Sequence, residues 1–326
     1  MRALVVEALL PDYAGCLVKE IPTPQPGPGE VLVRVRASAV NFPDLMQTRG
    51  EHQHKPPLPF VPGMELAGEV EAVGEGVTDF HPGDAVCGGG RGGMAEYAVL
   101  PAAGLRRKPD TLTFGQAAGY AVAYLTASVA FERCARLQPG EWVLIHGAAG
   151  GVGLAAVDLA RIMGAKVIAA SASDHKLAVI AAEYAPEATV NVTRGFRERV
   201  KDLTGGKGAD VIYDPVGGDV FDESLRCIAF GGRILSIGFT SGRLPVLPVN
   251  IALIKGFSVH GVRAGEYGRQ FPAKGRENNE AIWALAEAGL VKPRVDAEYP
   301  LDQWRAAFDS LADRKVIGKT IIRPDL

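Results

Sequence analysis

The first part of the chain alternates apolar and polar residues over short distances. Val31, Val33 and Val35 alternate with Arg34 and Arg36, which is the period-two pattern of a half-buried strand. Similar short runs are separated by turn segments rich in proline and glycine, at 21–29, 55–63 and 88–93. Strands this short and this often interrupted predict a barrel-like or coiled β domain over residues 1–122.

From residue 113 onward the pattern changes to alternating helices and strands. A helical segment over 114–136 precedes six strand-like apolar runs, at 142–146, 165–170, 188–192, 210–213, 233–237 and 257–260. Helical spacers separate these runs, for example at 151–163 and 174–184. Together they predict an α/β domain over residues 123–263, with a doubly wound parallel six-stranded sheet covered on both faces.

The C-terminal segment contains two further helical patterns, at 278–288 and 301–312, and a closing strand at 319–323. Because this strand lies outside the six-strand unit, residues 264–326 are expected to return to the first domain. The α/β domain would then be an insertion, and a ligand would bind in a cleft between the two domains.

Composition adds one unusual feature, an excess of glycine. The chain has 40 glycines in 326 residues, about 12% against a typical ~7%. Hydrophobic residues make up 47% of the sequence, which is too many for a disordered or collagen-like chain. The glycines therefore indicate a globular protein with many unusual backbone positions.

Charge and cysteine content exclude several classes of function. The 35 basic and 37 acidic side chains nearly balance, so neither nucleic acid nor a membrane is expected as a partner. The four cysteines are scattered and form no CxxC pair, which gives no disulfide framework and predicts a cytoplasmic location. Residues 1–10 do not resemble a signal peptide, and the most hydrophobic stretch, 117–131, is too short to cross a bilayer.

The strongest chemical signal is a glycine-rich loop between a predicted strand and a predicted helix. Glycines there allow a tight turn and let backbone N–H groups approach a pyrophosphate, to which the helix N-terminus adds its positive dipole end. The sequence therefore predicts a dinucleotide site. Its expected contacts are Gly147, Ala149, Gly150, Gly151, Val152 and Gly153.

The second strand of the α/β domain indicates which dinucleotide binds. NAD sites usually end this strand with an acidic residue that binds the ribose 2′-hydroxyl. Here the strand ends near Ser171 and Ser173, with Lys176 nearby, and Asp174 is expected in the first turn of the next helix. Small hydroxyls and a lysine suit a 2′-phosphate, which favours NADPH; ordinary helix capping and a solvated lysine are the alternative.

Several motifs together resemble the medium-chain dehydrogenase/reductase superfamily. They are the loop at 147–153, the segments Asn41–Asp44 and Pro62–Val70, and the ending Gly318–Ile322. The likeness covers essentially the whole chain and is strongest to the zinc-free quinone oxidoreductase (zeta-crystallin-like) branch. It implies a Rossmann domain plus a GroES-like coiled β domain, and a homodimer joined along the Rossmann sheet edge at 257–262.

The resemblance also bears on metal content and substrate. Zinc-dependent alcohol dehydrogenases of this superfamily have a cysteine near the position of Asn41 and a histidine at Met64, so no metal is expected here. Without a Lewis acid, the acceptor should be one that spreads the arriving charge, as a quinone does. We therefore expect hydride transfer from NADPH to a quinone. The alternatives are reduction of an activated C=C bond, in an enone or a 2-enoyl thioester, and a non-catalytic NADPH-binding structural or regulatory protein.

The resemblance assigns roles to individual residues. It implies that Asn41 and Asp44 are polar anchors at the nicotinamide and substrate, with local turn capping as the alternative. Thr126 would contact the nicotinamide or its ribose, or bond back to its own helix. Further cofactor contacts are expected from Gly217, Gly238, Phe239, Thr240 and Lys319.

Two departures from the family pattern are possible catalytic residues. His52 stands where related 2-enoyl thioester reductases have a tyrosine proton donor, and an imidazolium can also donate a proton. A solvated surface loop is the competing interpretation. Arg263 could meet an anionic substrate or the cofactor phosphates, or pair with Glu266. His146 is expected in the core, and the glycine cluster at 88–93 around Arg91 reads only as a flexible turn.

Overall fold

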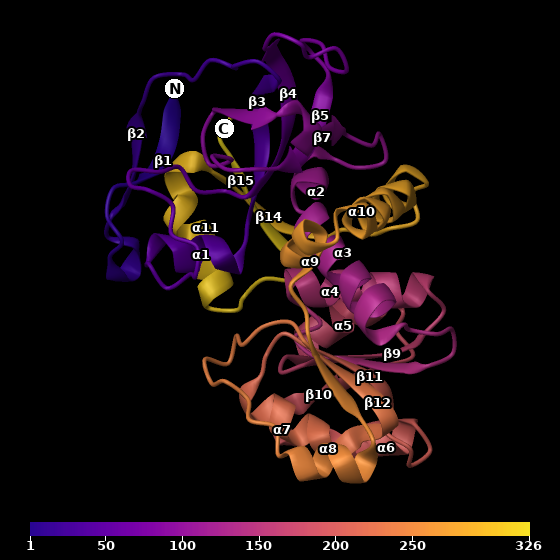
Figure 1. The fold of residues 1–326 in the computed structure, drawn as a ribbon. Coiled ribbons are helices and arrows are strands. Elements are labelled where there is room, and N and C mark those ends of the chain that lie inside the picture. The colour runs from indigo at the N-terminus through magenta and orange to yellow at the C-terminus, as the bar shows by residue number, and fades with distance from the viewer. The chain divides into compact units, whose positions relative to one another are not determined.

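The computed structural model describes all residues, 1–326, and divides them into two compact units. The first unit comprises residues 1–121 and 293–326, and the second comprises residues 122–292 (Figure 1). None of the helices is long and apolar enough to cross a membrane.

The first unit is a β domain with a few short helices. A seven-stranded sheet has the order β14-β15-β3-β4-β5-β7, with β6 also paired to β3, and β1 pairs separately with β2. The strands are β1 (Arg2–Val6), β2 (Cys16–Glu20), β3 (Glu30–Val40), β4 (Glu65–Val73), β5 (Ala85–Gly89), β6 (Tyr97–Pro101), β7 (Leu105–Arg107), β14 (Val295–Pro300) and β15 (Lys319–Arg323). The helices are α1 (Phe42–Thr48), α2 (Phe114–Ala118) and α11 (Trp304–Ala312), with 3-10 turns at Pro11–Tyr13, Ala102–Gly104 and Leu301–Gln303.

The closing strand returns to the first unit, as the sequence predicts. β15 pairs antiparallel with the end of β3, where Thr320 lies opposite Val40. The apolar face of α11 packs against this region, where Phe308 and Ile322 are fully buried. The C-terminal segment thereby fixes the end of β3, which directly precedes Asn41 of the polar network described below.

The second unit is a Rossmann domain. Its six strands are all parallel, in the order β10-β9-β8-β11-β12-β13, so the chain reverses direction across the sheet between β8 and β11. The strands are β8 (Trp142–Ile145), β9 (Lys166–Ser171), β10 (Ala188–Asn191), β11 (Ala209–Asp214), β12 (Ile228–Ser236) and β13 (Ser258–Gly261). This is the predicted six-stranded sheet, and the reversal marks the point where such folds bind their ligand.

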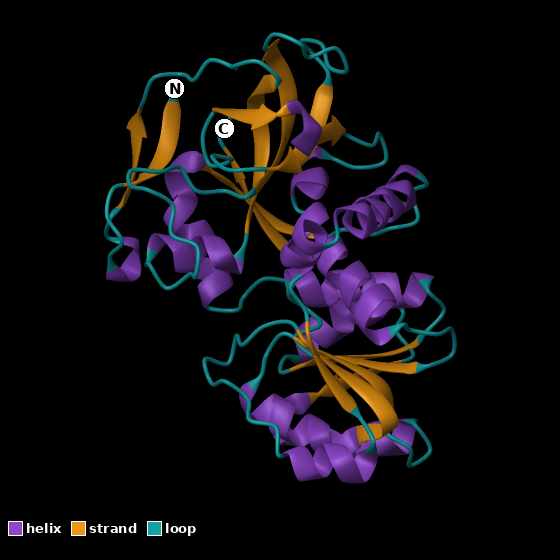
Figure 2. Ribbon diagram, viewed as in Figure 1, coloured by secondary structure: helices purple, strands orange, loops and turns teal.

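Two layers of helices enclose the Rossmann sheet (Figure 2). In Figure 1, α4 and α5 lie on one face, and α6, α7 and α8 lie on the other. The helices of this unit are α3 (Ala121–Ser128), a π-helical turn (Val129–Ala135), α4 (Gly151–Ile162), α5 (Asp174–Tyr184), α6 (Arg197–Leu203), α7 (Gly218–Cys227), α8 (Val249–Lys255), α9 (Ala264–Gln270) and α10 (Pro272–Glu287), with a 3-10 turn at Val192–Arg194. Covered on both faces, the strands can be almost wholly apolar.

The predicted helical segment over 114–136 is divided into three parts in the structure. α2 ends at Ala118, with Gly119 as its C-cap, α3 begins at Ala121, and the last part is π-helical. The break lies where the side chain of Lys319 crosses the backbone, because a Cβ on Gly119 would come within 3.0 Å of the lysine Cγ. A contact with a residue so distant in sequence leaves no signal in local periodicity.

The point at which the chain returns from the second unit to the first also differs from the predicted position. The prediction assigned residues 264–292 to the first domain, whereas they cluster with the second unit. Polar bonds explain this assignment, since Asn278 of α10 donates to the Ser128 hydroxyl (2.7 Å) and accepts from Arg133 (2.8 Å). The amphipathic pattern of α10 predicted a helix but could not identify its partner.

Candidate active site

The glycine-rich loop joins β8 to α4 in a conformation that needs its glycines. Gly147 has a φ of +54°. A Cβ on Gly153 would lie 2.1 Å from the carbonyl oxygen of Gly147, so the start of α4 touches the loop backbone directly. No side chain fits at that contact.

The start of α4 offers unfilled hydrogen-bond donors. The first N–H groups of a helix have no partner within it, and the N-cap residue Gly150 has no side chain to accept from them. A dinucleotide pyrophosphate provides such acceptors, and the bare backbone leaves room for it. The geometry therefore fits the predicted contacts at 147–153.

Small polar residues follow the second strand, as predicted. Ser171 ends β9, and the Ser173 hydroxyl caps α5 by accepting from the N–H of Lys176 (3.4 Å). Asp174 lies in the first turn of α5, where its carboxylate accepts from the Asn191 amide (2.6 Å). That carboxylate is thus occupied by a neighbouring strand end, and no acidic residue ends β9.

The loops that follow β11 and β12 are bonded to each other at the carboxyl end of the sheet. Asp214 accepts from the N–H groups of Val216 (2.8 Å) and Gly217 (2.9 Å), and burial raises the pKa of this carboxyl group. The N–H and hydroxyl of Thr240 both donate to the carbonyl of Pro215 (3.1 Å each). Gly217, Gly238 and Thr240 therefore lie together, while Phe239 beside them is 45% exposed.

Thr126, Arg263 and His146 have distinct surroundings within the second unit. The Thr126 hydroxyl donates to the carbonyl of Val122 (2.7 Å), which leaves it able to act toward a ligand only as an acceptor. Arg263 is exposed and forms no ion pair, because Arg269 and Gln270 occupy Glu266. His146 lies in the core, where burial lowers its pKa to about 3 and keeps the ring neutral.

A buried polar network occupies the first unit at the junction of β3, β4 and β15. The Lys319 ammonium donates to the Asn41 side-chain carbonyl (2.6 Å) and to the Glu65 carboxylate (2.8 Å). The Asn41 amide also donates to Glu65 (2.9 Å). Glu65 is 1% exposed and Lys319 is 9% exposed, so this is a nearly dry ion pair bridged by an amide.

Asp44 lies beside this network and is fully buried. Its carboxylate accepts from the N–H groups of Asn41 (2.8 Å) and Gly63 (3.2 Å), so it connects the start of α1 to the segment before β4. Burial raises its pKa to about 7, although the two N–H donors and the Lys319 charge act in the opposite direction. Asp44 thus caps the start of α1, and its buried carboxyl group holds a proton near neutral pH.

This burial predicts a pH-dependent contribution of Asp44 to stability. The unfolded carboxyl has a pKa of about 3.9, so the folded chain binds the extra proton between about pH 4 and 7. This contribution to the free energy of unfolding is roughly 4 kcal/mol. It is complete below about pH 4 and is lost as pH rises through 7. In Asp44→Asn this dependence should disappear, as measured by urea unfolding across the range. An unchanged slope would contradict the assignment, and Asp110→Asn, at an exposed turn, is the control.

His52 lies on the loop that follows α1. The N–H groups of Glu51 and His52 both donate to the carbonyl of Met46, which anchors the loop to the helix end. The His52 Nδ1 lies 3.1 Å from the N–H and 3.2 Å from the carbonyl of His54. The ring therefore has a partner for Nδ1 whether it is neutral or protonated, and Nε2 stays available to a ligand.

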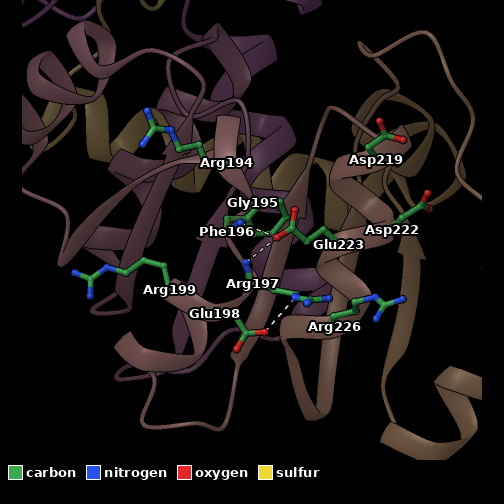
Figure 3. A pocket seen from close by; sticks show the side chains of 10 residues that line it. All are labelled: Arg194, Gly195, Phe196, Arg197, Glu198, Arg199, Asp219, Asp222, Glu223 and Arg226. Atoms are coloured by element: carbon green, nitrogen blue, oxygen red, sulfur yellow. Dashed lines mark hydrogen bonds and ion pairs between the residues drawn. The ribbon is translucent and has the colours of Figure 1, made fainter.

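The second unit also has a hollow of about 670 Å³ between α6 and α7 (Figure 3). Glu223 accepts there from the N–H groups of Phe196 (2.6 Å) and Arg197 (2.9 Å), and so caps α6. The side chains of Arg194 and Arg199 point away from Arg226 in Figure 3, and four acidic side chains share the lining. An anion site needs basic side chains that point toward one place without competing carboxylates. The lining does not meet this condition, so we assign no ligand to this hollow.

Comparison with known proteins places the chain in a family. Residues 27–110 match the family model described as the alcohol dehydrogenase GroES-like domain, and residues 151–277 match the one described as zinc-binding dehydrogenase. A quinone oxidoreductase-like protein 2 homolog of Nematostella vectensis is 44% identical over 91% of this chain and 82% of its own length. The chain belongs to the medium-chain dehydrogenase/reductase superfamily.

Its relatives within the superfamily include quinone oxidoreductases and quinone oxidoreductase-like proteins. The quinone oxidoreductase of Sus scrofa is 33% identical over 94% of this chain and 92% of its own length. The structure of Escherichia coli quinone oxidoreductase complexed with NADPH superimposes with a TM-score of 0.88 at 28% identity, over 99% of this chain and 100% of that one. The resemblance and the fold predicted from sequence are confirmed. This member of the superfamily is an oxidoreductase that uses a nicotinamide cofactor and acts on a small molecule.

One residue of the polar network was not among the predicted site residues. Glu65 was noticed only as part of a family motif, yet it joins Asn41 to Lys319. The available signal is a carboxylate that opens the strand Glu65–Val73, directly before the apolar residues Leu66 and Ala67. Its partner is 254 residues away, so the sequence alone could not identify the pair.

Proposed function

We propose that this chain is a zinc-independent reductase that transfers hydride from NADPH to a quinone. The observation that carries the proposal is the Asn41–Glu65–Lys319 network, in which the Lys319 ammonium is bonded to Glu65 and to Asn41, the residue that the family resemblance aligns near a zinc-binding cysteine. No group of three histidine, cysteine, aspartate or glutamate side chains is placed to hold a metal ion. A quinone spreads the arriving negative charge and can accept hydride with hydrogen-bond help alone.

The cofactor-binding residues are proposed from the Rossmann unit. The loop at 147–153 and the start of α4 would hold the pyrophosphate, and Gly217, Gly238, Phe239 and Thr240 would line the carboxyl edge of the sheet. Ser171, Ser173 and Lys176 would hold the 2′-phosphate. When bound, the nicotinamide supplies the hydride.

The remaining roles belong to polar residues near the acceptor. Asn41 and Asp44 would position the acceptor and nicotinamide, with Thr126 accepting a hydrogen bond and Lys319 contributing its charge. His52 would deliver the proton that completes reduction of the quinone to the hydroquinone, and Arg263 would meet an anionic group. The reaction then balances, because one hydride, which carries two electrons, and one proton convert each quinone to a hydroquinone.

The test is NADPH oxidation against a panel of quinones, enones and 2-enoyl thioesters, with protein dialysed against a chelator. We expect quinone turnover that chelation does not change. Activity that is lost on chelation and restored by zinc would overturn the metal-free assignment. Turnover confined to enones or thioesters would favour C=C reduction, and NADPH binding without any turnover would favour a non-catalytic role.

Cofactor preference gives a sharper prediction. Replacing Lys176 by alanine should weaken NADPH binding about tenfold, ~1.4 kcal/mol, and leave NADH binding unchanged, because only NADPH has the 2′-phosphate. Fluorescence titration with both cofactors measures this. Lys207→Ala, an exposed lysine before β11, should change neither. Equal wild-type affinity for NADH and NADPH would refute the 2′-phosphate argument.

We also propose that the chain forms a homodimer through the open edge of the Rossmann sheet. β13 pairs only with β12, and an unpaired edge strand invites another strand. Large apolar side chains are exposed beside it, with Phe230 83%, Leu253 81% and Ile254 73% exposed. The Phe230 ring lies against Gly256, between α8 and β13, so the patch is continuous with the edge. A second copy would cover both.

An aspartate in this patch should separate the subunits. Leu253→Asp would place a charge in the apolar interface, so we expect a monomer by light scattering where the wild type is a dimer. Leu290→Asp changes a leucine that is 53% exposed outside the patch and should leave the dimer intact. A wild-type monomer, or a Leu253→Asp dimer, would contradict the proposed interface.

The proposed location is the cytoplasm. All four cysteines are free thiols, three of them buried, which suits a reducing compartment. The proposed partner is a small molecule, with neither nucleic acid nor membrane involved, in keeping with a net charge of −2.

A further inference from the structure

The glycine cluster at 88–93 has a structural role that the sequence did not reveal. Within that run, whose first two glycines end β5, the only residue with a side chain is Arg91. A Cβ on Gly93 would lie 2.6 Å from the Ser38 hydroxyl, and Gly92 has a φ of +85°. The loop is therefore a bare backbone that passes close to β3 and presents one guanidinium to solvent.

Backbone hydrogen bonds tie this loop to the polar network of the first unit. The N–H of Gly90 donates to the carbonyl of Met64 (3.0 Å), and that of Gly93 donates to the carbonyl of Gly63 (3.2 Å). Met64 directly precedes Glu65, and the N–H of Gly63 donates to Asp44. Arg91 is thus held beside the segment that carries the network.

A second loop, at 49–55, contacts Arg91. It leaves the end of α1, the helix that begins next to Asn41, and is anchored there by the bond from the Glu51 N–H to Met46 (2.8 Å). A guanidinium nitrogen of Arg91 contacts the Nε2 of His54. This contact connects the loop that follows α1 to the glycine loop. The glycine loop is in turn bonded to Gly63, whose N–H donates to Asp44 of α1.

The charge on the two loops, at 49–55 and 88–93, is one-sided. The only carboxylate in the two loops, Glu51, pairs with Arg49 (2.9 Å). Lys55, next to His54, is exposed and forms no ion pair, and Arg91 has only the contact with His54. Most of the five N–H donors of Arg91 therefore have no hydrogen-bond partner. Lys55, next to the His54 that Arg91 contacts, is a second cation without an ion pair.

We propose that Arg91, together with His54 and Lys55, binds an anionic group on the acceptor. Guanidinium forks match phosphate, sulfonate and carboxylate oxygens, and two basic neighbours strengthen that preference. This inference rests on the proposed function and specifies its substrate class. The acceptor is a quinone or activated alkene that carries an anionic substituent away from the reacting atoms.

Matched pairs of acceptors test the inference. One pair is naphthoquinone and its sulfonate, and the other is the crotonyl thioester of N-acetylcysteamine and crotonyl-coenzyme A. Arg91→Gln should raise KM for the anionic member about tenfold and leave kcat and the KM of the neutral member unchanged. Arg91→Lys should recover part of the loss, and salt should raise KM for the anionic member in wild type more than in Arg91→Gln.

A KM effect on both anions indicates recognition of charge, and an effect on coenzyme A alone indicates a phosphate site; either supports the proposal.

Arg276→Gln, an exposed arginine of α10 without an ion pair, is the matched control and should change nothing. Equal effects of Arg91→Gln on both members of each pair, or no effect on either, would overturn the inference. If the wild type turns over no acceptor, the proposed function fails, and calorimetric binding of coenzyme A then tests the site alone. Binding about tenfold weaker in Arg91→Gln supports the site, and equal or absent binding in both proteins overturns it.

Discussion

Replacing Lys319 by methionine should lower the free energy of unfolding by ~3–5 kcal/mol, because one partner of a buried ion pair is removed while the other stays. The Glu65 carboxylate, 1% exposed, would lose its ammonium partner and keep the hydrogen bond from the Asn41 amide. The Asn41 carbonyl would also lose its ammonium partner. Urea unfolding followed by circular dichroism measures the loss.

A double variant separates this explanation from simple loss of packing. Removing both charges in Glu65→Leu with Lys319→Met should unfold at a higher urea concentration than Lys319→Met alone, since no unpaired charge remains buried. Lys315→Met changes an exposed lysine near the same strand and should leave the midpoint where it is. If the single and double variants unfold alike, the ion pair does not account for the stability.

The second large effect is expected at Gly153. Even the methyl group of Gly153→Ala would lie 2.1 Å from the Gly147 carbonyl oxygen and 2.8 Å from its carbon, and both are backbone atoms that cannot rotate away. The loop and the start of α4 must therefore separate. We expect NADPH binding to weaken at least a hundredfold, ~2.7 kcal/mol or more, by fluorescence titration.

The matched control for this prediction is Gly265→Ala in α9. A Cβ there meets nothing closer than 3.8 Å, so neither binding nor folding should suffer. Near-native circular dichroism of Gly153→Ala would show that the loss is local to the loop. Wild-type NADPH affinity in Gly153→Ala would mean that the loop does not hold the pyrophosphate.

Much of the Rossmann unit could be predicted because its signals are local. Each strand of the sheet is a short apolar run bounded by turn residues, and the alternation of strands with helices predicts parallel pairing. The loop at 147–153 was identified by its place between such a strand and a helix. The closing strand Lys319–Arg323 was also found with its correct bounds.

The candidate site was predicted less completely. Asn41, Asp44 and Lys319 were named individually, through resemblance to a family, and Lys319 was assigned to the cofactor. In the structure its ammonium is bonded to Asn41 and Glu65. Arg91 was read as part of a flexible turn, although it contacts His54 on a loop 37 residues earlier.

The sequence by itself determined the order of the elements, the parallel sheet and the position of the glycine-rich loop at 147–153, because periodicity and turn chemistry act over a few neighbouring residues. Only the tertiary structure decided which polar groups meet in the dry interior and where the chain leaves one unit for the other. Lys319 lies 278 residues from Asn41, and Asn278 lies 150 residues from Ser128. Such pairs form because a buried polar group must find a partner, and chain folding rather than local pattern determines which partner is in reach.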